Sequence, residues 1–198
     1  MHYTKHLQSG RRPLTDSERK ECQGIVDFCE KKLKESPAPR TLLGRVLDSL
    51  SPAKELRQIR QNQVVSNRQI LEAEYVEVLR CTPQAVIHIA QYEDEGHHYF
   101  FDVGEDTLLF FGGQDYRPTK AFPNTDFELV RLAGGSIFRM NRFGKKLRAV
   151  RTIPKKVAVG LHVYAVGIFT FRGKLDTAER DYQAYIESAD STDILEWS

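Results

Sequence analysis

The sequence is poor in cysteine and in long apolar runs, and each shortage excludes a class of protein. Its 198 residues include three cysteines, Cys22, Cys29 and Cys81, too few and odd in number for a disulfide-stabilised secreted domain. The longest uncharged, mostly apolar stretch, residues 157–171, is shorter than the roughly 20 residues of a membrane-spanning helix. Residues 1–12 lack the apolar core of a signal peptide. We therefore expect reduced thiols, no spanning segment and a cytoplasmic location.

Motifs of the common enzyme classes are missing as well. The sequence has no Gly-x-Ser-x-Gly, no phosphate-binding loop, no dinucleotide fingerprint and no His-Glu-x-x-His. Cys81 has no identifiable histidine partner, so we interpret it as an inert, packed thiol. His88 and His162 lie among apolar residues and are interpreted as satisfied residues of a sheet. We predict no catalytic residue and no cofactor.

The composition is that of a globular protein, with 40% hydrophobic and 28% charged residues, and the N-terminal part has helical periodicity. Residues 14–35 carry a capping-box pair, Thr15 and Glu18, ahead of an apolar stripe with helical spacing. A second helix is expected over 41–50, and a third from 51 that fades at 61–63. These helices predict either a packed helical subdomain or an arm that associates with itself or with a partner protein.

From residue 72 onward the pattern changes to short segments rich in β-branched and aromatic residues, separated by Gly, Pro, Asn and Asp. This pattern predicts an antiparallel meander that closes as a small barrel or sandwich. A short helix is expected to begin after Asp176 or Thr177 and to run through Glu187. The predicted fold class is α+β, with a helical region over 1–65 and a β domain over 66–198.

The net charge of +2 hides a strongly uneven distribution. Residues 136–174 contain ten Lys and Arg and no Asp or Glu, whereas residues 61–135 are acidic. We read residues 137–153 as a hairpin that pairs with acidic strands at 72–77 and 93–106, giving cross-strand ion pairs. The alternative is an electropositive ridge for nucleic acid, phosphoinositide or an acidic protein. The candidate anion-binding residues are Arg139, Arg142, Lys145, Lys146, Arg148, Arg151, Lys155 and Lys156.

The densest group of potential metal ligands lies at residues 93–102. His97, His98 and Asp102 are the candidate ligands, and they would belong to a metal-dependent hydrolase. His97 and His98 are neighbours on a predicted strand, so their side chains are expected on opposite faces. A hairpin tip with a solvated acidic loop is the competing interpretation.

Three segments carry a resemblance to a known family. They are Glu93–Gly96 with Tyr99–Gly104, Leu108–Gln114, and Phe122–Glu128. Over roughly residues 70–187 the chain resembles a family of uncharacterised bacterial proteins whose soluble domain often follows transmembrane segments. The resemblance implies a β-rich bacterial domain and assigns no catalytic residues.

Together these observations lead us to expect a non-enzymatic binding or assembly module whose N-terminal helices mediate association. The alternatives are a binder of anionic ligands, nucleic acid or a membrane surface, through residues 139–156, and a metal-dependent hydrolase.

Overall fold

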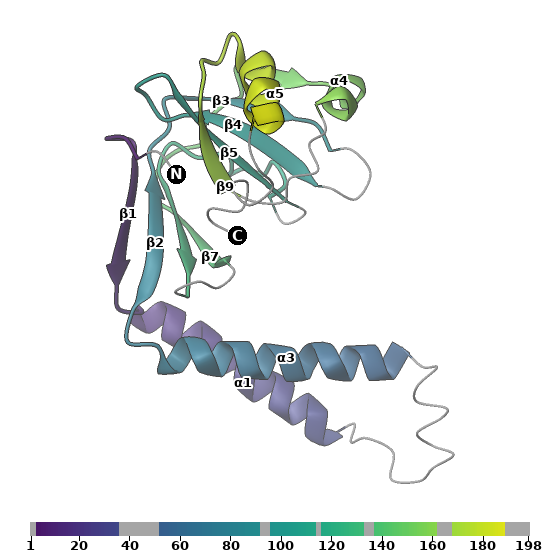
Figure 1. The fold of residues 1–198 in the computed structure, drawn as a ribbon. Helices are drawn as coiled ribbons and strands as arrows, with labels where there is room; N and C mark the ends of the chain where they lie inside the picture. Colours follow the sequence, from purple (N-terminus) through teal and green to yellow (C-terminus); the bar gives the residue numbers. More distant parts are fainter. Residues whose placement is uncertain are drawn as a thin grey trace. The chain divides into compact units, whose positions relative to one another are not determined.

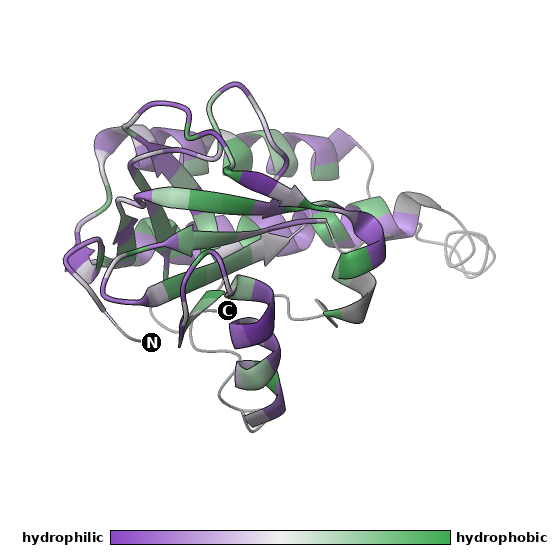
Figure 2. Ribbon diagram, turned by 90° about the horizontal axis from the view of Figure 1, so that it is seen from above, coloured by the Kyte–Doolittle hydropathy of each residue, from purple (hydrophilic) through white to green (hydrophobic). Residues whose placement is uncertain are grey.

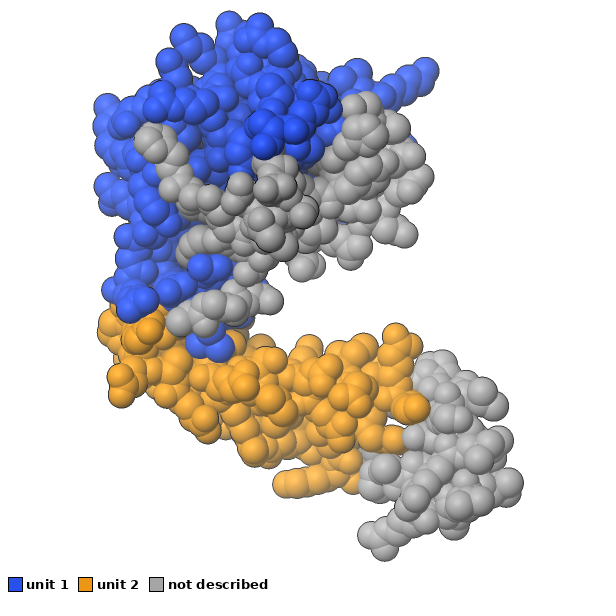
Figure 3. Space-filling view, viewed as in Figure 1, with its two compact units in different colours: residues 1–11, 77–198 blue, residues 12–76 orange. Residues whose placement is uncertain are grey.

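The computed structural model describes residues 3–35, 52–91, 96–113, 116–132, 137–161 and 168–188. It has the predicted α+β composition and divides into two compact units, residues 1–11 with 77–198 and residues 12–76 (Figure 3). Figure 1 shows the elements, which are β1 (Leu7–Arg12), α1 (Asp16–Glu35), α3 (Pro52–Glu72), β2 (Val76–Cys81), β3 (Ala85–Ile89), β4 (His97–Asp102), β5 (Thr107–Gly113), β6 (Phe127–Arg131), β7 (Ile137–Arg142), β8 (Arg151–Ile153), α4 (Lys155–Gly160), β9 (Ile168–Arg172) and α5 (Ala178–Ser188). The helix expected over 41–50 lies outside the described residues.

In the described part of residues 12–76, helices α1 and α3 pack against each other as a helical hairpin. The predicted capping box is confirmed: Thr15 N donates to Glu18 Oε2 at 2.8 Å, and Glu18 N donates to Thr15 Oγ1 at 3.3 Å. Arg12 adds a two-pronged ion pair to the same buried carboxylate, at 2.7 and 2.8 Å. α3 does not fade at 61–63, because glutamine and asparagine in this run remove no backbone hydrogen bond.

The first sheet has the strand order β1-β2-β6-β7. Its first strand, β1, precedes the helices, so the chain does not begin with a helix as the sequence suggested. β2 and β6 are antiparallel with Leu79 opposite Leu129 and Cys81 opposite Phe127. β6 pairs with β7 in the same sense, with a register shift after Val130. Helices α1 and α3 are thus inserted between two neighbouring strands of one sheet.

The second sheet has the order β8-β3-β4-β5-β9. β3, β4, β5 and β9 are antiparallel neighbours, whereas β8 runs parallel to β3. The predicted hairpin over 137–153 is therefore wrong. β7 is an edge of the first sheet and β8 an edge of the second, so residues 143–150 pass from one sheet to the other. The described strands form two separate sheets and no closed barrel.

Alternate side chains of the second sheet supply two apolar clusters. Val86, Tyr99 and Phe101 join Leu79 and Phe127 of the first sheet in one cluster. On the other face of the second sheet, a second cluster combines its aromatic residues with Tyr182 of α5; its strand members include Phe100, Phe110, Phe169 and Phe171. Figure 2 shows hydrophobic residues concentrated along these strands. This two-sided burial explains why β4 and β5 read as nearly continuous apolar segments.

None of the described helices is long and apolar enough to cross a membrane.

Candidate functional site

Two histidines from neighbouring strands meet on one face of the second sheet. His88 Nε2 lies 2.9 Å from His97 Nδ1, and the rings are stacked with centroids 5.1 Å apart. His88 is directly opposite Tyr99 in the β3–β4 register, which places His97 on its diagonal. Both imidazoles are partly exposed, so they form a surface pair rather than a core contact.

Among the described residues, two cationic side chains, Lys146 and Arg117, act on this pair. Burial, followed by His97 and Lys146, lowers the pKa of His88 to about 4. Burial and then Arg117 lower the pKa of His97. Lys146 Nζ donates to the carbonyl oxygen of Thr119 at 2.8 Å and to that of Phe122. The pair is therefore neutral at pH 7 and lies next to two cationic side chains.

The structure separates the predicted metal ligands. His97 contacts His88, whereas His98 is on the opposite face, stacked on Phe110 with ring centroids 5.5 Å apart. Asp102 Oδ1 accepts a hydrogen bond from the Gly104 amide at 2.9 Å. No group of three His, Cys, Asp or Glu side chains that would hold a metal ion occurs in the described parts of the chain. Sequence reasoning missed the partnership of His88, because a diagonal contact depends on the strand register.

His98 is 2% exposed, and its Nε2 has no hydrogen-bond partner among the described residues. Gly112 lies directly opposite it, and a Cβ at Gly112 would fall 1.9 Å from the His98 Cδ2 atom. Burial, and then His97, lower the pKa of His98 to about 4. His98 is thus a neutral core residue, packed where β5 has no side chain.

The basic residues at 139–156 belong to two edge strands and the segment between them. Arg139 Nε donates to Asn141 Oδ1 at 2.7 Å, and Arg151 makes a two-pronged ion pair with Glu179 of α5. Neither β7 nor β8 lies directly beside the acidic strands at 72–77 and 93–106, since β7 pairs with β6 and β8 with β3. Lys174, at the end of the basic run, does pair with Asp106 at 3.6 Å. Lys155 begins α4.

Four cations of this segment have exposed side chains that make no ion pair within the described structure: Arg142, Lys145, Arg148 and Lys156. Exposed apolar side chains alternate with them along the chain, namely Phe143, Val150 and Val157. Arg80 stacks on Phe143, with its Cζ 3.9 Å from the ring centroid. The segment thus combines unpaired cations with exposed apolar groups.

The helical hairpin also leaves apolar side chains exposed. Among the described residues of the hairpin, Val26, Cys29 and Val64 are buried in a cluster between the helices. Phe28 is 58% exposed, Leu56 50% and Ile59 46%.

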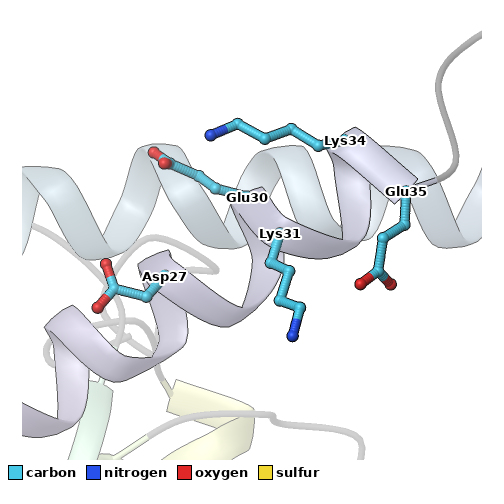
Figure 4. A pocket seen from close by; sticks show the side chains of 5 residues that line it. All are labelled: Asp27, Glu30, Lys31, Lys34 and Glu35. Atoms are coloured by element: carbon cyan, nitrogen blue, oxygen red, sulfur yellow. The ribbon is translucent and has the colours of Figure 1, made fainter.

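A surface hollow of about 480 Å³ lies along the C-terminal half of α1 (Figure 4). Five charged side chains of this one helix line it: Asp27, Glu30, Lys31, Lys34 and Glu35. Figure 4 shows them pointing in different directions rather than at a common centre. Another hollow, of about 460 Å³, lies beside β1 and β2, where Glu77 pairs with Arg11 and Arg131. We assign a ligand to neither hollow.

All three cysteines are free and buried. Cys29 Sγ donates to Gln63 Oε1 at 3.1 Å, and burial followed by the Asp126 charge raises the pKa of Cys81. The prediction that the thiols are packed is confirmed.

Comparisons with protein-family models, curated proteins and solved structures found no match for this chain.

Proposed function

We propose that this chain is a non-enzymatic assembly module of the cytoplasm, in which the hairpin of α1 and α3 pairs with the hairpin of a second copy. The observation that carries the proposal is the exposure of Phe28, Leu56 and Ile59 on one side of the hairpin.

Helical geometry places these residues in two parallel rows. Successive residues of a helix are 100° apart around its axis. One row of α3 side chains, which includes Val64 and Leu71, faces α1, and the row beside it has residues spaced alternately three and four positions apart. The neighbouring row on α3 is Leu56, Ile59, Gln63 and Ser66, and the corresponding row on α1 is Glu21, Phe28, Lys32 and Glu35. Ile70, which continues the α3 row, is 4% exposed, and Ile25 packs against the cluster between the helices, so neither belongs to the exposed face. A spacing of this kind is typical of helices that pack against a further helix.

Two contacts fix which side of the hairpin these rows share. The hydrogen bond from Cys29 to Gln63 spans the edge of the hairpin on which both rows lie. The ion pair between Arg68 and Glu30 closes the opposite side, which also carries Val65. The exposed apolar residues of α1 and α3 therefore form one face, the hairpin face, and Val65 lies outside it.

The hairpin face is large enough for a dimer. α3 is about 30 Å long, and two adjacent helices are about 20 Å wide, which gives about 600 Å² on each copy. Pairing of two such faces would bury about 1,200 Å², the lower end of stable protein interfaces. A twofold arrangement uses the same face on both copies and closes the assembly as a dimer.

The test is the oligomeric state of the full chain, measured by sedimentation velocity from about 1 to 100 μM. The wild type is expected to be a dimer, and Ile59→Glu a monomer with unchanged helical circular dichroism. Val65→Glu is the matched control, since Val65 is 57% exposed on the other side of the same helix. A monomeric wild type at 100 μM contradicts the proposal, and so does equal dissociation of both variants.

A second candidate function is binding of polyanions, either nucleic acid or an anionic lipid surface, by residues 139–156. The unpaired Arg142, Lys145, Arg148 and Lys156 favour it, because the acidic strands leave them uncompensated. The double variant Arg142→Glu with Arg148→Glu should lose binding to single-stranded DNA and to phosphatidylserine vesicles. Wild-type binding should weaken steeply between 50 and 200 mM salt. Salt-independent binding contradicts this function.

A further inference from the structure

The His88–His97 pair has electrostatic surroundings that suit one kind of ligand. One imidazole donates its N–H to the other across 2.9 Å, so each ring retains one nitrogen for a further contact. Tyr99 does not compete for those nitrogens, because its hydroxyl donates to the Tyr116 carbonyl oxygen at 2.7 Å. On β8, the residue opposite His88 is Thr152, which carries no charge.

A divalent cation fits this place poorly. A zinc site needs at least three protein ligands, and the described residues supply two imidazoles with no carboxylate or thiolate beside them. Lys146 and Arg117 also act on the two histidines as positive charges, and these would repel a bound metal ion.

An anion fits the same features well. Lys146 uses two donors on the carbonyl oxygens of Thr119 and Phe122, which fix the position of its ammonium group and leave a third donor. Arg117 is exposed and makes no ion pair within the described residues. Its guanidinium is suited to two-pronged contact with a tetrahedral oxyanion. In the neutral pair, the one ring N–H that is not used between the two imidazoles would donate to the same ligand.

We propose that His88, His97, Lys146 and Arg117 form a binding site for a small oxyanion of the phosphate class, either free or as a phosphomonoester group. The site is independent of the hairpin face. It shares Lys146 with the basic residues at 139–156, but it does not require Arg142 or Arg148.

The test is a phosphate titration of the ¹⁵N-labelled full chain, followed through the imidazole nitrogens by NMR at constant ionic strength. Saturable shifts are expected at His88 and His97, with chloride as the reference anion. Arg117→Gln should weaken binding about twofold to fivefold, the range of one exposed ion pair. Lys145→Gln is the matched control, since Lys145 is the exposed neighbour of Lys146, and it should bind as the wild type does.

Other outcomes also separate the explanations. Phenyl phosphate and phosphatidic acid vesicles distinguish a free phosphate group from a lipid headgroup, and saturable binding of any of the three supports the site. Lys146→Gln should also weaken phosphate binding, with circular dichroism used to verify that the variant is folded. If the Lys146 variant is unfolded, phosphate binding by the Arg117→Gln variant tests the proposal. The double variant at Arg142 and Arg148 should retain phosphate binding even where it loses DNA. Non-saturating shifts equal to those in chloride, or saturation by zinc alone, overturn the proposal.

Discussion

The burial of His98 predicts that acid weakens the fold by a calculable amount. Its pKa is lowered from 6.5 to about 4 in the folded state, first by burial and second by His97. The unfolded chain therefore takes up a proton at a higher pH than the folded chain does, and stability is lost as the pH falls below about 6.5. A difference of about 2.5 pKa units corresponds to about 3 kcal/mol in full, of which about 2 kcal/mol is lost by pH 5.

The assay is urea unfolding of the wild type and of His98→Leu at intervals from pH 7.5 to pH 5. Leucine retains an apolar group against Phe110 and removes the titrating nitrogen. The wild type should lose about 2 kcal/mol more than the variant over this range. A constant difference in unfolding free energy between the two proteins at every pH would refute the reasoning, because His98 would then bind protons equally in both states.

Three further predictions concern packing and local structure. Gly112→Ala should destabilise the protein by about 1–3 kcal/mol, since the added Cβ would overlap the His98 ring, and most of this cost should disappear in a His98→Ala background when both are measured by urea unfolding. Thr15→Ala should cost about 1 kcal/mol by removing the cap that pairs with Glu18, with amide hydrogen exchange faster in the first turn of α1; unchanged exchange there would contradict the capping role. In a variant that retains Cys81 as its single cysteine, Ellman's reagent should react only after unfolding, because burial raises the pKa of that thiol; rapid labelling of the folded protein would contradict this.

The elements that the sequence predicted well are those set by local signals. The capping box at Thr15 and Glu18 needs only residues three apart, and the apolar stripe of α1 follows from helical spacing alone. α5 starts at Ala178, directly after the predicted Thr177. β1 was missed because only Leu7 among its residues is buried, so the strand has no apolar alternation.

The features that were missed depend on distant parts of the chain. The Gly-Lys-Lys segment at 144–146 suggested the turn of a local hairpin. The three residues of β8 pair instead with β3, which lies far away in the sequence. Because β7 pairs with β6 and β8 with β3, Arg142 and Arg148 do not lie beside the acidic strands that were expected as their neighbours. His97 had been grouped with His98 by sequence adjacency, whereas the β3–β4 register brings it to His88.

The insertion of α1 and α3 between β1 and β2 has a consequence for protein engineering. Figure 1 shows β1 and β2 running in opposite directions, and His6 O accepts from Thr82 N at 2.9 Å while Arg11 pairs with Glu77. The two points where the helices leave and rejoin the sheet are therefore a hairpin's width apart. A chain cut near residue 65 would lose β1 and expose the edge of β2, a template for aggregation. Replacement of residues 13–75 by an Asn-Gly turn would instead keep both strands and yield a smaller protein of two sheets with α4 and α5.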